Sequence, residues 1–130
     1  MLLAFYGSLT SAGDVSFSRE VAPILQRHCV ACHKEGKAKG KYRLDTYEQL
    51  REELEPGDLE SELLFRITTE DEEERMPAEA DPLAGSEINV IRKWVAEGAE
   101  YDGEDPAALL ASIIPMKDHP AAPESYPRPL

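Results

Sequence analysis

Apolar residues recur with a helical period in three parts of the chain, and the segments between them are polar or rich in glycine and proline. The first pattern covers residues 18–31. Ser18 is expected to cap this helix, and Pro23 is tolerated because it lies in the first turn. Four residues fall at i, i+3, i+4 and i+7 and so share one helix face, namely Val21, Ile24, Leu25 and His28.

Further helices are expected downstream of a polar, glycine-containing loop. A short helix is predicted over residues 46–54, before the break at Pro56-Gly57. Asp58 is expected to cap a second clear helix, whose apolar stripe is Leu59, Leu63, Leu64 and Ile67.

The last helical pattern spans residues 86–98, with Ser86 as the N-cap and Gly98 as the C-terminal glycine. Its core-facing residues are Ile88, Ile91, Trp94 and Val95. The chain has no internal repeat and no strand pattern. These features predict an all-α fold.

Composition divides the chain into three parts. Residues 1–14 have a short apolar run followed by small residues but no basic start, which indicates a leader or the remnant of a signal peptide. Residues 15–102 are expected to form the domain. Six of the ten prolines lie in residues 103–130, a composition typical of an extended linker or tail. Four apolar residues at its start leave open that this part packs on the domain: Leu109, Leu110, Ile113 and Ile114.

Charge limits the kinds of partner. The chain of 130 residues has 26 acidic and 14 basic side chains, a formal net charge of −12. A nucleic-acid binder needs a basic face, and an anionic membrane surface would repel this protein. The apolar run at the start is too short to cross a bilayer. A partner with a basic docking face remains compatible, as does an acidic surface that serves only solubility.

The two cysteines of the chain lie three residues apart, in Cys29-Val30-Ala31-Cys32-His33. Such a CxxCH sequence is the attachment signal for c-type haem. Thiols one helical turn apart can each form a thioether with a haem vinyl group, and the histidine that follows offers a ring nitrogen to iron. A redox CxxC needs a βαβ context, and a structural zinc site needs four ligands, which so short a peptide cannot place around one ion. The sequence therefore predicts one covalent haem c, an iron cofactor bound by Cys29, Cys32 and His33.

A second axial ligand is expected from Met76. Met1 is terminal and Met116 lies in the Pro-rich segment, whereas Met76 lies in a polar loop after the acidic run 70–74. Pro77 stiffens the backbone beside it. Ligation by histidine and methionine, here His33 and Met76 at the metal, is the usual arrangement for electron transfer. His28 is the alternative for bis-histidine ligation, although it lies next to Cys29 and so on the proximal segment.

A basic stretch follows the motif in this acidic chain, comprising Lys34, Lys37, Lys39, Lys41 and Arg43. Arg43 is the best candidate among them for pairing with a haem propionate, and an ordinary solvated loop is the alternative. Trp94 is expected to pack in the core or on the haem edge, and the role of an ordinary core aromatic is favoured over one in electron relay.

Several short segments together resemble the planctomycete-type cytochrome c domain, a small module of large secreted or periplasmic bacterial proteins. The resemblance covers about residues 15–100 and includes Val15-Ser16-Phe17, Val21-Ala22-Pro23-Ile24-Leu25, the CxxCH motif, Arg43-Leu44-Asp45, Pro56-Gly57-Asp58, Ser61-Glu62-Leu63-Leu64, Arg75-Met76-Pro77 and Trp94-Val95-Ala96-Glu97-Gly98-Ala99. It implies a class I cytochrome c-like fold wrapped around one haem, with Met76 as the distal ligand and a periplasmic or secreted location. Since members of the family are fused to other modules, residues 103–130 resemble the linker to one.

Two functions remain open at this point. The first is electron transfer with a redox partner protein or a fused domain, without enzymatic activity of its own. The second is a haem enzyme or small-ligand sensor in which a labile distal ligand exposes the iron. A zinc module without haem is a remote third.

Overall fold

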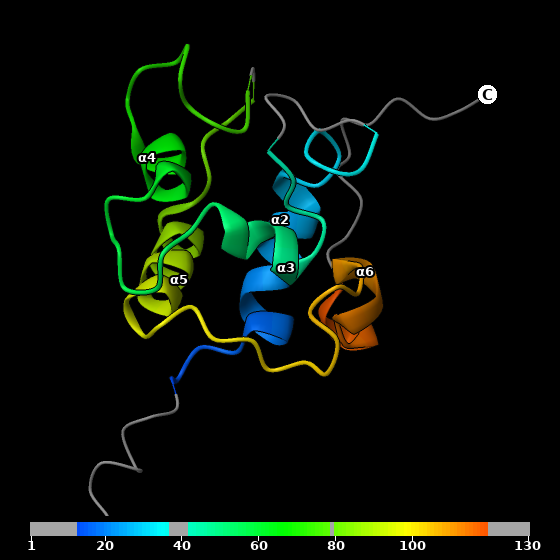
Figure 1. Cartoon of the computed structure of the whole chain (residues 1–130). Helices are drawn as coiled ribbons and strands as arrows, with labels where there is room; N and C mark the ends of the chain where they lie inside the picture. Colours follow the sequence, from blue (N-terminus) through cyan, green and yellow to red (C-terminus); the bar gives the residue numbers. More distant parts are fainter. Residues whose placement is uncertain (1–12, 37–41, 79, 120–130) are drawn as a thin grey trace, which may run out of the picture.

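The computed structural model describes residues 13–36, 42–78 and 80–119, and within these ranges the chain is helical and forms no strand (Figure 1). The elements in chain order are η1 (Phe17–Val21), α2 (Ala22–His28), α3 (Tyr47–Glu52), α4 (Glu62–Thr68), α5 (Gly85–Ala96), α6 (Leu110–Ile113) and η3 (Met116–Asp118). The all-α class predicted from the sequence is confirmed. None of the helices in the described ranges is long and apolar enough to cross a membrane.

The first helix begins earlier than the sequence indicates, because Ser16 and not Ser18 is its cap. The Ser16 hydroxyl accepts the N–H of Arg19 at 3.1 Å, and the Ser16 N–H donates to the Glu20 carboxylate at 2.7 Å. These two bonds satisfy backbone groups that a helix start leaves unpaired. The π-helical turn η1 follows and buries Phe17 completely before α2 continues to His28.

The start of α4 also differs from the prediction. Ser61 is the N-cap, with its hydroxyl accepting the N–H of Leu64, so the helix begins at Glu62. The carboxylate of Asp58 instead accepts the N–H of Glu60 at 2.9 Å, which holds this segment in a turn. Leu59, expected in the apolar stripe, is therefore 47% exposed.

Helix α5 confirms three of the four predicted core positions. Ile91, Trp94 and Val95 are buried, whereas Ile88 is half-buried at the edge of the core. The helix begins at Gly85, and its first turn is closed by Glu87, whose side chain accepts the N–H of Ala84 at 3.0 Å. Ser86 is therefore not the cap.

The end of α5 requires a glycine. Gly98 has φ = 112°, a left-handed conformation that suits glycine, and its N–H donates to the carbonyl of Val95 at 3.0 Å. Gly98 is the glycine that ends the helix, as predicted, although the last helical residue is Ala96 and not Gly98.

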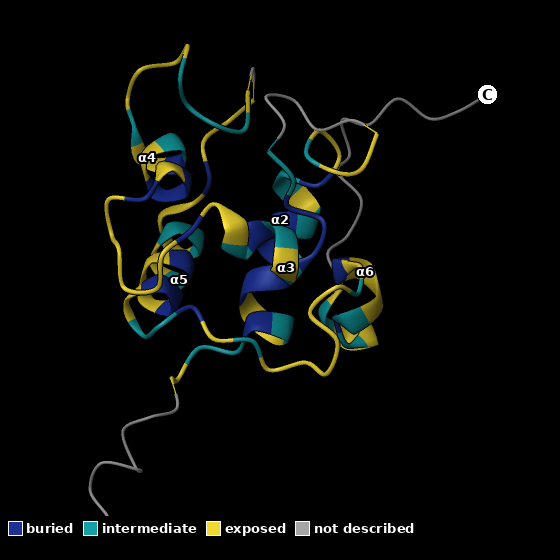
Figure 2. Ribbon diagram, viewed as in Figure 1, coloured by how far each residue is buried: buried dark blue, intermediate teal, exposed yellow. Residues whose placement is uncertain are grey.

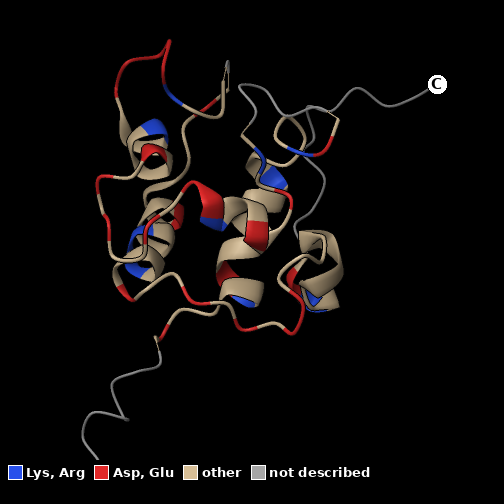
Figure 3. Cartoon of the chain, in the orientation of Figure 1, with Lys and Arg blue, Asp and Glu red and all other residues tan. Residues whose placement is uncertain are grey.

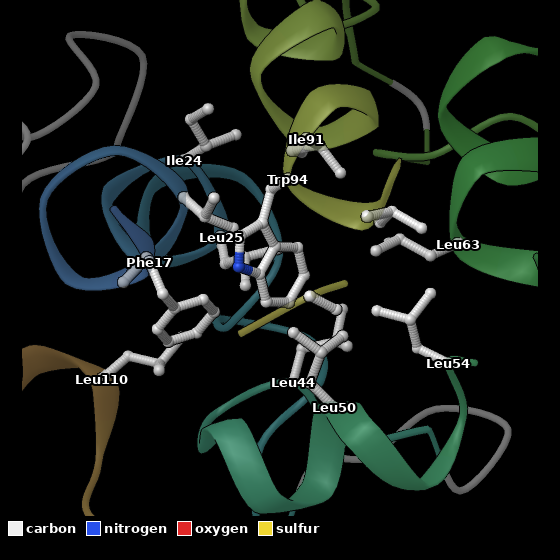
Figure 4. Packing of buried hydrophobic residues seen from close by; sticks show 14 of the residues in the cluster. Phe17, Ile24, Leu25, Leu44, Leu50, Leu54, Leu63, Ile91, Trp94 and Leu110 are labelled. Atoms are coloured by element: carbon white, nitrogen blue, oxygen red, sulfur yellow. The ribbon is translucent and has the colours of Figure 1, made fainter. Parts of the chain in front are cut away.

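A cluster of aromatic rings joins segments that are far apart in the sequence. Figure 4 shows two of its members, Phe17 and Trp94, among the buried apolar side chains. The rings of Phe17 and Trp94 lie 5.1 Å apart between centroids, and those of Tyr47 and Tyr101 stack at 4.6 Å. The indole N–H of Trp94 donates to the carbonyl of Glu100 at 2.8 Å, so its one polar atom is satisfied in the core. These contacts connect η1, α3, α5 and the segment after α5. Figure 2 marks the buried residues along the ribbon, which occur in α2, α3, α4, α5 and α6.

Residues 106–114 pack onto this core. The N–H of Leu110 donates to the carbonyl of Asp45 at 2.9 Å, and the carbonyl of Pro106 accepts the N–H of Glu48 at the same distance. Leu110 is 1% exposed and Ile114 is also buried, and α6 contacts α2 (Figure 1). The start of the Pro-rich segment thus contributes apolar side chains to the same core as α2 and α3.

Adjacent leucines of this segment allow a matched test. Leu110→Ala should lower the free energy of unfolding by about 2–5 kcal/mol, because it removes a buried side chain and leaves a cavity. Leu109→Ala should change it by less than about 0.5 kcal/mol, because Leu109 is 58% exposed. Denaturant unfolding followed by circular dichroism measures both. Equal effects for the two variants would contradict the packing of residues 106–114.

Candidate functional site

The CxxCH motif forms a hydrogen-bonded turn directly after α2. The N–H groups of Cys32 and His33 donate to the carbonyl of Cys29 at 3.2 and 3.0 Å. Both cysteines are free thiols; Cys29 is half-buried against the core, and Cys32 is exposed. Burial, together with the nearby Cys32 and Glu87, raises the pKa of Cys29 to about 12, so this thiol is protonated at neutral pH. One thiol therefore lies at the core and the other at the surface.

The imidazole of His33 is held in one orientation by the backbone of Tyr42. Its Nδ1 lies 2.8 Å from the carbonyl oxygen of Tyr42. A carbonyl can only accept, so Nδ1 carries the proton and Nε2 keeps its lone pair. The carbonyl of His33 in turn accepts the N–H of Leu44 at 2.7 Å. The hydrogen bond thus fixes the ring orientation and, in the neutral imidazole, the tautomer whose Nε2 can bind a metal.

A buried carboxylate, Asp45, ties the same two segments together. It accepts two hydrogen bonds from the Arg43 guanidinium, at 3.1 and 3.0 Å, and one from the N–H of Glu35 at 3.2 Å. Burial raises the pKa of Asp45, but the hydrogen bonds from Arg43 and Glu35 outweigh this effect and hold the pKa below its ordinary value. Sequence reasoning missed Asp45, although the Arg43-x-Asp45 spacing was visible.

Arg43 is therefore engaged with Asp45, and the structure does not test its predicted propionate contact. The guanidinium has five N–H groups, and Asp45 takes two of them. The remaining groups are on a partly exposed side chain. Of the other residues in the basic stretch, Lys34 is exposed, and positions 37–41 lie outside the described residues.

Tyr42 is a second residue that the sequence did not indicate. Its ring stands edge-on to that of His33, with centroids 5.9 Å apart. Its hydroxyl is buried and has no hydrogen-bond partner among the described residues. Burial and the nearby acids Glu53 and Glu62 raise the pKa of this hydroxyl. The phenol is consequently neutral, and a buried hydroxyl beside His33 remains able to donate a hydrogen bond.

Met76 lies in the loop between α4 and α5. It is half-buried, and its N–H donates to the carbonyl of Arg66 at 2.8 Å. The Arg66 guanidinium also donates to the carbonyl of Glu74 at 3.2 Å, so the loop is attached to the end of α4 at two points. In Figure 1 this loop (green) and the turn that carries the CxxCH motif lie at the same end of the molecule. The role of Met76 as a ligand stays a prediction.

His28, the alternative ligand, is already bonded elsewhere. Its Nε2 lies 3.1 Å from the carboxylate of Glu87 in the first turn of α5. The contact keeps His28 on the α2–α5 side, so of the two histidines that flank the cysteines His33 is the one whose Nε2 is not hydrogen-bonded to a described residue. Within the described residues, no group of three or more His, Cys, Asp or Glu side chains could hold a metal ion.

The donor set fits a covalently attached haem. Two free thiols flank the turn, and one histidine offers a lone pair with its other nitrogen fixed by a carbonyl. A helical domain with this set of groups belongs to the class of c-type cytochrome domains.

Comparison with known families indicates which kind of c-type cytochrome domain this is. Residues 29–79 match the family model described as Planctomycete cytochrome C. This match supports a planctomycete-type cytochrome c domain in the part of the chain that holds the motif and Met76, as the resemblance indicated. Such domains imply haem c and haem-based electron transfer, and they are typically extracytoplasmic. The comparisons with curated proteins and with solved structures gave no match.

The Asp45 cluster gives a prediction on pH. Because the folded-state pKa of Asp45 lies below its ordinary 3.8, its stabilising contribution is complete above that value and is lost as the pH falls through the lowered pKa. Asp45→Asn should cost about 1–3 kcal/mol at neutral pH and should flatten the fall in stability below about pH 4. Denaturant unfolding at a series of pH values measures this. Asp81→Asn, at an exposed position, is the control and should follow the wild type. An unchanged acid profile in Asp45→Asn would contradict the proposed pairing.

Proposed function

We propose that residues 15–102 form a mono-haem c-type cytochrome domain that transfers electrons, with His33 and Met76 as the axial ligands of iron. The single observation that carries the proposal is the 2.8 Å hydrogen bond between His33 Nδ1 and the Tyr42 carbonyl. It fixes the tautomer that leaves Nε2 available, and such a bond also increases the basicity of a ligating imidazole.

The haem, when bound, supplies a one-electron couple between ferric and ferrous iron. The chain's own residues then divide the remaining tasks. Cys29 and Cys32 attach the group, one at the core and one at the surface. Tyr42 and Leu44 orient His33 through backbone hydrogen bonds. The N–H groups of Arg43 that do not bond to Asp45 would donate hydrogen bonds to a haem propionate.

Electron transfer is favoured over ligand chemistry because two protein ligands leave no coordination position for a substrate. Cys32 is exposed, which supports an attachment edge near solvent that a redox partner can approach. The acidic run in the loop before Met76 is largely exposed and forms a red stretch in Figure 3. It suits a partner with a basic docking face, either a separate protein or a fused module.

The setting we propose is extracytoplasmic, in the periplasm or after secretion. Residues 1–14 are then the remnant of a leader, and residues 1–12 of this segment lie outside the described residues. Residues 103–130 lead toward a further module, with their first part packed on the core and positions 120–130 outside the described ranges.

Covalent attachment is tested by mass. Protein matured in a bacterial periplasm should have the mass of the chain plus one haem under denaturing conditions, because thioether bonds survive unfolding. The double variant Cys29→Ala, Cys32→Ala should have the mass of the chain alone. A wild-type protein without covalent haem, or with bound zinc in its place, would overturn the proposal.

The distal ligand is tested by Met76→Ala, with Met116→Ala as the matched control because Met116 is 87% exposed. The oxidised wild type should show the near-infrared band of methionine bound to ferric haem. Met76→Ala should lose this band and have a lower reduction potential, because a thioether ligand favours the reduced state. Met116→Ala should behave as the wild type.

Two results would contradict this ligand assignment. An unchanged spectrum and potential in Met76→Ala would exclude Met76. Ready binding of carbon monoxide by the reduced wild type would indicate a labile distal position and would favour the sensor or enzyme function instead.

A further inference from the structure

A hollow of about 460 Å³ lies between the end of α4 and the first half of α5. This α4–α5 hollow has an apolar part formed by Ile67, Pro82 and Ile88. Its polar lining consists of Thr68, Thr69, Glu70, Arg75, Asn89 and Arg92. The residues proposed to bind or contact haem are not among its lining.

Arg75 is the unusual residue in this lining. Its Nε is buried and has no hydrogen-bond partner among the described residues. The chain has 26 acidic side chains, yet the ion pairs formed within the described ranges do not include Arg75. A buried donor of a charged group without a partner is unfavourable and requires an explanation. Arg75 also lines a second, smaller hollow of about 280 Å³.

A second guanidinium reaches the same space from α5. Arg92 donates one hydrogen bond, from Nη1 to the side-chain oxygen of Asn89 at 3.2 Å. Asn89 is neutral, so this bond does not pair the charge of Arg92 with a carboxylate. Gly85, the first residue of α5, lines the hollow too, and the positive end of the helix dipole lies there. The lining of the hollow therefore includes two arginines and the start of α5 but only one acidic residue, Glu70.

A hydroxyl donor completes the lining. Thr69 Oγ1 accepts the N–H of Asp71 at 3.2 Å, and its own proton remains available to donate. Thr68 differs, because its hydroxyl already donates to the carbonyl of Leu64 at 2.6 Å. The donors therefore come from the loop, from the end of α4 and from α5, and they surround one space.

We propose that the α4–α5 hollow binds a small oxyanion, a carboxylate or a phosphate, through the guanidinium groups of Arg75 and Arg92. Planar guanidinium groups pair with such anions in a bidentate manner, and the bonds are stronger than neutral ones. The net charge of −12 makes unspecific anion binding unfavourable elsewhere on the surface. Because Arg75 precedes Met76, a bound anion connects the loop that carries Met76 to α5.

The test is a titration of the full-length, haem-loaded protein with inorganic phosphate and, separately, with citrate. Backbone amide shifts in two-dimensional NMR report binding at named residues. Saturable shifts are expected at Thr69, Arg75 and in the first two turns of α5. Arg75→Gln and Arg92→Gln should each weaken binding by about tenfold or more, because each removes charge-assisted hydrogen bonds.

Arg27→Gln is the matched control. Arg27 is exposed in α2, and the variant removes the same charge far along the chain from the hollow. It should alter the affinity by less than about twofold. Arg75→Lys keeps the charge and loses the planar fork, so it should also weaken binding, and it remains informative if Arg75→Gln folds poorly.

Two outcomes would overturn the inference. One is the absence of saturable shifts with either anion. The other is an equal loss of affinity in Arg27→Gln, since that would attribute binding to overall charge. Both results concern the hollow alone and are independent of which residue is the distal ligand of iron.

Discussion

The hydrogen bonds between the attachment turn and residues 42–45 hold the functional part of this molecule in place. His33 donates from Nδ1 to the carbonyl of Tyr42 and accepts the N–H of Leu44, and the side chain of Asp45 accepts the N–H of Glu35. A turn of five residues has too few internal contacts to fix an imidazole ring. The neighbouring segment supplies the fixed acceptor for Nδ1–H, and as a result the lone pair of the neutral ring is on Nε2.

The rest of the fold positions these two segments relative to each other. Phe17 of η1 packs on Trp94 of α5, and Tyr47 of α3 donates from its hydroxyl to the carbonyl of Ala99 at 2.7 Å. The first turn of α3 is bonded to residues after α5 as well, because Glu48 donates to Pro106. The aromatic cluster therefore fixes the start of α3, and residues 42–45 directly precede that helix.

Three arginines in this acidic chain illustrate how its few cations are used. Arg43 stabilises the buried Asp45, and Arg66 pairs with Glu62 one turn before it and holds the Met76 loop at the carbonyl of Glu74. Arg75 has neither kind of partner in the described part of the chain. Arg43 and Arg66 thus stabilise the fold, and the unpaired Arg75 supports the proposal of a ligand that is not part of the chain.

The sequence alone was sufficient for the helical class, for the CxxCH turn and for the family, because these depend on local spacing: apolar residues with a helical period, Gly98 at a helix end, and two cysteines followed by a histidine. It was insufficient for the caps at Ser16 and Ser61, where side-chain bonds to nearby N–H groups decided between equally suitable residues. It also gave no indication that Tyr42 and Asp45 hold His33 and Arg43, or that Arg75 lacks a partner. These roles depend on which segments meet in space, and long-range packing, not local pattern, determines that.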